Sequence, residues 1–176
     1  MNSMIVKDQL RILIGDDSFA KENEKAKDAV DSMFCSMAET AQHNKAFPIR
    51  TELESGMYIG RNVVPYAAEI QIKAVPSVEE LIREAEEGRY DLVVTDLEYG
   101  KFGGERGGVK VIDKLQGNHT LALCTSSQDC QLLADLGNRV QILAAPGLEE
   151  VFVLNKFELL GEKISQFYLK KSTGDK

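Results

Sequence analysis

The feature of this sequence that most limits how it can fold is an alternation of short apolar segments with longer amphipathic ones. The apolar segments, such as Ile12–Ile14 and Leu92–Val94, are bounded by polar residues and have the length of buried strands. The amphipathic segments repeat apolar residues at helical spacing, as Val78, Leu81 and Ala85 do. Strands that alternate with helices predict βαβ units and a parallel sheet covered by helices on both faces.

The predicted elements follow that order along one domain spanning residues 1–176. Strands are predicted at Arg11–Ile14, Glu69–Val75, Tyr90–Asp96 and Thr120–Cys124, with Val140–Ala144 and Val151–Leu154 as two candidates for the last strand. Helices are predicted at about 19–43, 78–87, 109–115, 132–136 and 157–167. The segment at about 44–66 contains Pro48, Pro65 and a Ser55-Gly56 turn pair, which predicts an inserted loop or small hairpin.

Charge and composition narrow the classes of function. Lys and Arg total 21 against 28 Asp and Glu, a net charge of −7, which argues against nucleic acid or an anionic membrane surface as a partner. The first residues lack the pattern of a secretory leader, and the apolar runs are too short to span a bilayer. Three cysteines without a CxxC pair predict reduced thiols, so we expect a cytoplasmic protein without a zinc site.

Polar residues stand where the predicted strands end. Asp16 and Asp17 follow the first strand, Asp96 closes a later one, Thr125 follows the next, and Lys156 follows Val151–Leu154. The carboxyl ends of parallel strands share one edge of a sheet, so three carboxylates are predicted to converge there. Such a cluster suits Mg²⁺, which prefers oxygen ligands, and a hydroxyl and an ammonium could hold the oxygens of a phosphoryl group.

These residues resemble the active site of the receiver domain of bacterial two-component response regulators. The resemblance covers Ile12–Asp17 and about Ile70–Ile164, and includes the helix Gly108–Leu115 after the phosphoacceptor strand. It implies a flavodoxin-like fold, a doubly wound parallel five-stranded sheet in a three-layer αβα sandwich. The segment at about 44–66 lies outside the resemblance.

The resemblance also implies the role of each residue at the site. Asp96 would accept the phosphoryl group, and Thr125 and Lys156 would contact its oxygens. Mg²⁺ would be held by Asp17 and Asp96, by Asp16 through water, and by the backbone carbonyl of Glu98. The family usually has Met-Pro where Tyr99-Gly100 stands here, and the following loop is longer and rich in glycine.

The position of the family's lysine can be aligned in two ways. Lys156 fits if Val151–Leu154 is the last strand, which is the alignment we favour, although Phe157 follows it instead of the usual proline. The rival alignment places Ala145-Pro146 at the Lys-Pro position and would leave the site without a lysine. Neither alignment supplies the family's aromatic switch residue.

The function implied is that of a stand-alone receiver-like domain in a phosphorelay, which needs Mg²⁺ and signals through protein partners. Those partners would be a sensor histidine kinase or phosphotransfer protein and a downstream protein target. Beyond self-phosphorylation from a phosphodonor and self-dephosphorylation, no enzymatic activity is expected. Two alternatives are a degenerate receiver that acts as a phosphorylation-independent interaction module and a Mg²⁺-dependent enzyme on a flavodoxin-like sheet.

Overall fold

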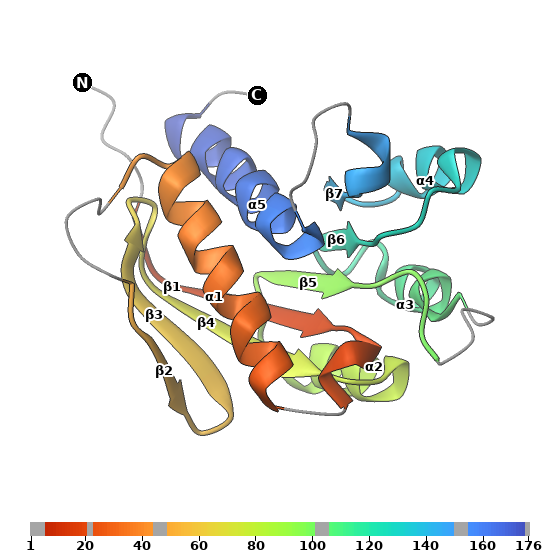
Figure 1. The fold of residues 1–176 in the computed structure, drawn as a ribbon, viewed down its shortest axis with the longest axis horizontal. Coiled ribbons are helices and arrows are strands. Elements are labelled where there is room, and N and C mark those ends of the chain that lie inside the picture. Colours follow the sequence, from red (N-terminus) through yellow and green to blue (C-terminus); the bar gives the residue numbers. More distant parts are fainter. Residues whose placement is uncertain (1–5, 21–22, 44–48, 101–105, 150–154, 175–176) are drawn as a thin grey trace.

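A computed structural model describes residues 6–20, 23–43, 49–100, 106–149 and 155–174. Its centre is a seven-stranded sheet in the order β2-β3-β4-β1-β5-β6-β7 (Figure 1). The strands are β1 Lys7–Gly15, β2 Thr51–Glu54, β3 Met57–Val64, β4 Ala67–Val75, β5 Leu92–Thr95, β6 Leu121–Cys124 and β7 Ile142–Ala144. The helices are α1 Asn23–Thr40, α2 Val78–Glu87, α3 Gly107–Leu115, α4 Cys130–Gly137 and α5 Lys156–Thr173.

Five of these strands form the parallel sheet that the sequence predicts. β1 pairs in parallel with β4 on one side and with β5 on the other, and β6 and β7 follow β5 in parallel. Counting only these five strands along the chain, the order is 2-1-3-4-5, which is the doubly wound flavodoxin-like arrangement. The predicted fold class is therefore confirmed.

The sheet is larger than predicted because the segment at about 44–66 contributes two more strands. β2 and β3 form an antiparallel hairpin, and β3 pairs antiparallel with β4, so the sheet has seven strands instead of five. The hairpin turns at Ser55 and Gly56, whose φ angles of 51° and 77° are those that a tight two-residue hairpin turn requires. The predicted small hairpin is thus present, as an extension of the sheet beyond β4.

Two apolar cores lie on opposite faces of the sheet. α1 and α5 pack against one face, where the buried side chains include Phe34, Met37 and Leu160. α2, α3 and α4 cover the other face, with Leu81 and Leu133 among its buried side chains. Figure 1 shows α1 and α5 next to each other on one side of the sheet. The three layers agree with the predicted αβα sandwich.

The first helix begins later than the sequence suggests. A 3₁₀ turn at Asp17–Ala20 follows β1, and α1 begins at Asn23 instead of near Phe19. α5 has clear signals at both ends: the Asn155 side chain accepts hydrogen bonds from the N–H groups of Phe157 and Glu158, and Gly174 ends the helix with a φ of 73°.

The strand next to β6 is not the segment that our favoured alignment predicts. β7 is Ile142–Ala144, it pairs with β6, and Ala145-Pro146 follows it directly. Lys156 is the first residue of α5, so it does not close the strand next to β6. The strand predicted at 151–154 lies outside the described residues. The rival alignment therefore placed the last strand correctly. The position of that strand does not decide where the Lys156 side chain lies.

The contact between α1 and α5 yields a prediction about stability. A methyl group on Gly161 would lie 2.6 Å from the carbonyl oxygen of Met33 and 3.0 Å from the Cβ of Ser36. Gly161→Ala should therefore lower the free energy of unfolding by about 1–3 kcal/mol through overpacking, despite the better helix propensity of alanine. Urea unfolding measures the change. Gln166→Ala, at an exposed position of the same helix, is the control, and a more stable Gly161→Ala protein would contradict the packing described here.

Candidate functional site

The site lies at the carboxyl-terminal edge of the parallel strands, and main-chain hydrogen bonds hold its parts together. Asp16 follows β1, and its N–H donates to the carbonyl of Val75 at 3.1 Å. Asp96 follows β5, and its N–H donates to the carbonyl of Gly15 at 3.0 Å. These bonds continue the pairing of β1 with β4 and β5, so the two aspartates are placed by the sheet itself.

Three carboxylates converge at this edge. Asp16, Asp17 and Asp96 each offer an oxygen atom within 4.8 Å of the others. Asp16 and Asp96 are only 2% and 9% exposed, whereas Asp17 is half-buried. The Asp17 carboxylate accepts a hydrogen bond from the N–H of Gly100 at 3.0 Å, which ties the turn after β1 to the loop after β5. The predicted convergence is therefore observed.

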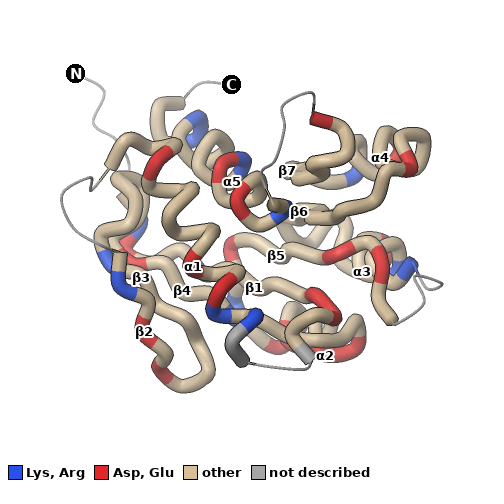
Figure 2. The backbone as a smooth tube through the Cα atoms, viewed as in Figure 1, with Lys and Arg blue, Asp and Glu red and all other residues tan. Residues whose placement is uncertain are grey.

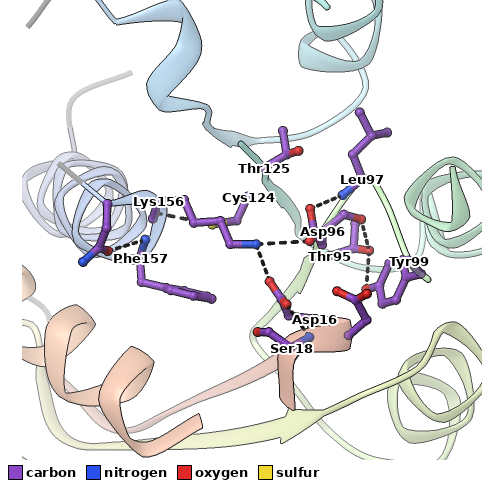
Figure 3. A network of polar contacts seen from close by, with 12 residues as sticks. Asp16, Ser18, Thr95, Asp96, Leu97, Tyr99, Cys124, Thr125, Lys156 and Phe157 are labelled. Atoms are coloured by element: carbon purple, nitrogen blue, oxygen red, sulfur yellow. Dashed lines mark hydrogen bonds and ion pairs between the residues drawn. The ribbon is translucent and has the colours of Figure 1, made fainter. Parts of the chain in front are cut away.

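The Lys156 side chain reaches into this cluster from the first turn of α5. Its ammonium donates to Oδ2 of Asp16 and, at 3.1 Å, to Oδ2 of Asp96 (Figure 3). The side chain is 16% exposed, so the pair of contacts is largely shielded from water. The site thus has a lysine although the residue after β7 is Ala145.

The remaining oxygens of the two buried aspartates accept from nearby main-chain groups. Oδ1 of Asp16 accepts from the N–H of Ser18 at 2.9 Å, and Oδ1 of Asp96 accepts from the N–H of Leu97 at 2.7 Å. Each carboxylate therefore has one oxygen turned toward Lys156 and one toward its own loop. Both side chains are held in a fixed orientation as a result.

Burial raises the pKa values of Asp16 and Asp96 and the charge of Lys156 lowers them, but the balance differs between the two residues. Burial raises the pKa of Asp96 above its ordinary value, and the attraction of Lys156 offsets only part of that effect. Burial acts in the same direction on Asp16, but Lys156 and the hydrogen bonds from Ser18 together lower the pKa of Asp16. Burial disfavours the charged form of Lys156, yet Asp96 and Asp16 outweigh it and raise the pKa of Lys156.

Two other predicted site residues lie at the same edge without contacting the lysine. Thr125 follows β6, is 2% exposed, and donates its N–H to the carbonyl of Ala144 at 3.0 Å. Its hydroxyl oxygen accepts from the N–H of Ser127 at 3.1 Å, which leaves the hydroxyl hydrogen uncommitted among the described residues. Thr125 and Asp96 follow the neighbouring strands β6 and β5 (Figure 3). Glu98 lies half-buried in the loop after Asp96, and its role remains a prediction.

A buried hydroxyl pair behind Asp96 was not foreseen. Thr95 donates to the carbonyl of Asp96 at 2.8 Å, so the Tyr99 hydroxyl, 2.9 Å from Thr95, must be the donor in their contact. Tyr99 fills the space next to Gly15 and Gly107, where an added methyl group would lie 2.7 Å and 3.0 Å from its side chain. The pair fixes the loop that carries Glu98.

A local sequence pattern predicts the contact of Ser18 with Asp16 but not the contacts of Tyr99. An aspartate two residues before a serine is a common turn signal, so the bond from Ser18 to Asp16 could have been predicted. For Tyr99, the sequence shows only that Tyr99-Gly100 stands where receiver domains usually have Met-Pro. Its contacts with Gly15 and Gly107 depend on how three separate segments meet, and no local pattern records that.

No protein-family profile matches the sequence, and no curated protein matches it. A solved structure of a yeast Spc42 trimeric coiled-coil segment fused to another structure aligns at 14% identity and a TM-score of 0.54, over 97% of this chain and 85% of that one.

Solved receiver domains also align with most of the chain. The receiver domain of the Francisella response regulator 1452 shares 12% identity at a TM-score of 0.49, over 92% of this chain and 98% of that domain. The response regulator domain of Thermotoga maritima CheB shares 12% identity at a TM-score of 0.48, over 94% and 96%. At these identities and TM-scores, neither alignment carries an argument about this chain. Within the described part of the chain, no helix has the length and apolar character needed to cross a membrane.

Neutralising the two buried aspartates should change stability in opposite directions in buffer free of divalent cations. Asp16→Asn loses a charged partner of Lys156 and Ser18, and should lower the free energy of unfolding at about pH 7 by about 2 kcal/mol. Asp96→Asn should raise it, because a folded-state pKa above the ordinary value means that ionised Asp96 opposes folding.

The two effects should depend on pH with opposite signs. The stability that Asp16 supplies is present above its ordinary pKa of 3.8 and is lost as the pH falls through its lower folded value. The gain from Asp96→Asn should be largest above the raised pKa of Asp96 and should vanish below 3.8, where both states are protonated. Urea unfolding at a series of pH values measures both. Equal shifts in the same direction for the two variants would contradict this account.

Proposed function

We propose that this chain is a receiver-like signalling domain that accepts a phosphoryl group on Asp96. The observation that carries the proposal is the placement of the Lys156 ammonium against both Asp16 and Asp96, with the Asp17 carboxylate beside them. A carboxylate nucleophile with a fixed cation next to it, at a partly buried sheet edge, is suited to receive a phosphoryl group, because this transfer depends mainly on positioning and charge neutralisation.

The transfer itself can be written for this chain. An oxygen of the ionised Asp96 carboxylate attacks the phosphorus of the donor, the new O–P bond forms, and the bond to the leaving group breaks with its electron pair. Lys156 would bind a phosphoryl oxygen with the ammonium that now contacts Oδ2 of Asp96. The Thr125 hydroxyl, whose hydrogen is uncommitted among the described residues, would donate to another. Both groups come from elements other than β5.

The acidic residues fit a magnesium ion in number and type. Three carboxylates against one ammonium leave a net charge of −2, which a hard divalent cation with oxygen ligands balances. As the resemblance to receiver domains implies, Asp17 and Asp96 would bind it directly, Asp16 through water and Glu98 through its carbonyl. When bound, Mg²⁺ would supply neutralisation of the charge on the phosphoryl oxygens.

Signalling would depend on protein partners and on α5. A sensor histidine kinase or phosphotransfer protein would supply the phosphoryl group, and a downstream protein would recognise the modified domain. Ile142 in β7 is aliphatic, so an aromatic switch at that position is not available. Because Lys156 begins α5, a change in its bonding to Asp96 acts directly on the helix that packs against α1. We expect α5 to transmit the state of the site.

Acetyl phosphate tests the proposed modification. In the presence of Mg²⁺ the wild-type chain should gain one phosphate, and chelation of the metal should abolish the gain, because the three carboxylates then repel the donor. Asp96→Asn should not be modified, and Asp17→Asn should be modified far more slowly. Intact-mass spectrometry measures the adduct. An unmodified wild type under conditions that phosphorylate an ordinary receiver domain would favour the phosphorylation-independent interaction module instead.

Beryllofluoride, a mimic of the phosphoryl group, tests the role of Lys156. Lys156→Ala should weaken its binding by at least about tenfold, the usual value of a hydrogen bond between charged groups. Lys163→Ala is the matched control, because Lys163 lies on the same helix and pairs with Glu149 away from the site. Calorimetry in the presence of Mg²⁺ gives both affinities. The role assigned to Lys156 fails if the two variants bind beryllofluoride equally well.

A further inference from the structure

A second candidate site lies at the opposite edge of the sheet from the aspartates. It is a cavity of about 260 Å³, here called the tyrosine cavity, lined mainly by Lys7, Tyr66, Asp91, Tyr168, Lys171 and Ser172. Lys7 begins β1, Tyr66 and Asp91 lie just before β4 and β5, and the other three belong to the last turns of α5. The cavity is therefore at the amino ends of the parallel strands, away from the proposed phosphorylation site.

Two stacked aromatic rings are among its lining residues, and both are almost entirely buried. Tyr66 and Tyr168 are 2% and 6% exposed, and their ring centres lie 5.7 Å apart at an angle of 20°. The Tyr66 hydroxyl lies 2.8 Å from the Ser165 hydroxyl, which donates to the carbonyl of Met37, so Tyr66 donates to Ser165. The Tyr66 hydroxyl is therefore committed to the protein, and at 2% exposure almost none of its ring is open to a ligand.

The Tyr168 hydroxyl has no hydrogen-bond partner among the described residues, although the side chain is almost entirely buried. The hydroxyl oxygen is not among the buried polar atoms that lack a partner, so it contacts solvent at the cavity, where it can donate to a bound acceptor. Burial raises the pKa of Tyr168, and the nearby Asp91 carboxylate adds to this effect. The phenol therefore stays protonated at neutral pH and acts as a donor.

The charged groups around the cavity favour an acceptor. Asp91, its one carboxylate, accepts from Lys7 at 2.6 Å and from the N–H of Arg11 at 2.8 Å, so each of its oxygens has a partner. Lys171 has no carboxylate partner in the described part of the chain, and its ammonium lies 4.8 Å from the ring centre of Phe167. Figure 2 shows basic residues at this end of α5. Lys7, Lys171 and Asp91 together carry a charge of +1 in a chain of −7.

We propose that the tyrosine cavity binds a small organic anion with a flat apolar body, of the class of aromatic carboxylates. The anionic group would accept from the Lys171 ammonium and the Tyr168 hydroxyl, and the flat body would lie against the exposed edge of Tyr168 and the aliphatic parts of Lys7 and Thr120. The volume is just below the usual range of ligand pockets, which suits nothing larger than a single ring. A cationic ligand is disfavoured because the acceptor that it would need is already paired with Lys7 and Arg11.

Benzoate, benzylamine and inorganic phosphate serve as probes of the full chain, with calorimetry for affinity and amide NMR shifts for location. Benzoate should bind with a dissociation constant of roughly 1 mM or below and shift amides near Lys7, Asp91 and Tyr168. Benzylamine has the same ring with the opposite charge, and phosphate has charge without a ring, so both should bind at least about tenfold more weakly. Comparable binding of either probe, or no binding of benzoate, would overturn the proposal.

Substitutions locate the binding groups. Lys171→Gln should weaken benzoate binding about tenfold, and Tyr168→Phe, which keeps the ring, about fivefold. Lys170→Gln is the matched control, because Lys170 lies in the same turn but does not line the cavity, and it should leave the affinity unchanged. Asp96→Asn should also leave it unchanged, so the result does not depend on phosphorylation. Equal affinities for the Lys171→Gln and Lys170→Gln proteins would assign the binding to general charge and overturn the site.

Discussion

The arrangement of this protein depends on one problem of electrostatics, the burial of two aspartates at the same edge of a sheet. Asp16 and Asp96 are brought together by the parallel pairing of β1 with β5, and neither is free to turn away, because each is also held by its own loop. Their charges need a counter-charge in the same shielded place. Lys156 supplies it, and this places a demand on the position of α5, which must begin within reach of both carboxylates.

Because α5 must begin within reach of both carboxylates, the site is linked to the rest of the fold. α5 begins at Lys156 and packs along α1, with Gly161 allowing the two helices to approach closely. Its last turns reach the opposite edge of the sheet, where Tyr168 and Lys171 line the tyrosine cavity. α5 therefore connects the three aspartates, the apolar core that it shares with α1 and the tyrosine cavity. A shift of its first turn would be felt along its whole length, since a packed helix moves as a rigid element.

Much of this could be read from residue patterns, and the failures have identifiable causes. The parallel strands were predictable because their short apolar runs end at polar residues, and the aspartates were predictable for the same reason. The hairpin of β2 and β3 was less certain because its exposed strand β2 has no apolar repeat, and it is held to the sheet by pairing through β3. The last strand of the sheet was placed at 151–154 because that segment has the composition of a strand, whereas Ile142–Ala144 forms the pairing with β6 and 151–154 lies outside the described residues.

The sequence by itself determined the class of fold and the chemistry available at one edge of the sheet, because both follow from local periodicity and from the residue type at each strand end. Only the tertiary structure decided which side chains meet. The lysine reaches the aspartates from the start of a helix, the Tyr99 hydroxyl supports the loop after Asp96, and Tyr168 is left with an uncommitted donor. These contacts join segments far apart in the chain, and their distances are set by how the helices pack on the sheet, which no local pattern encodes.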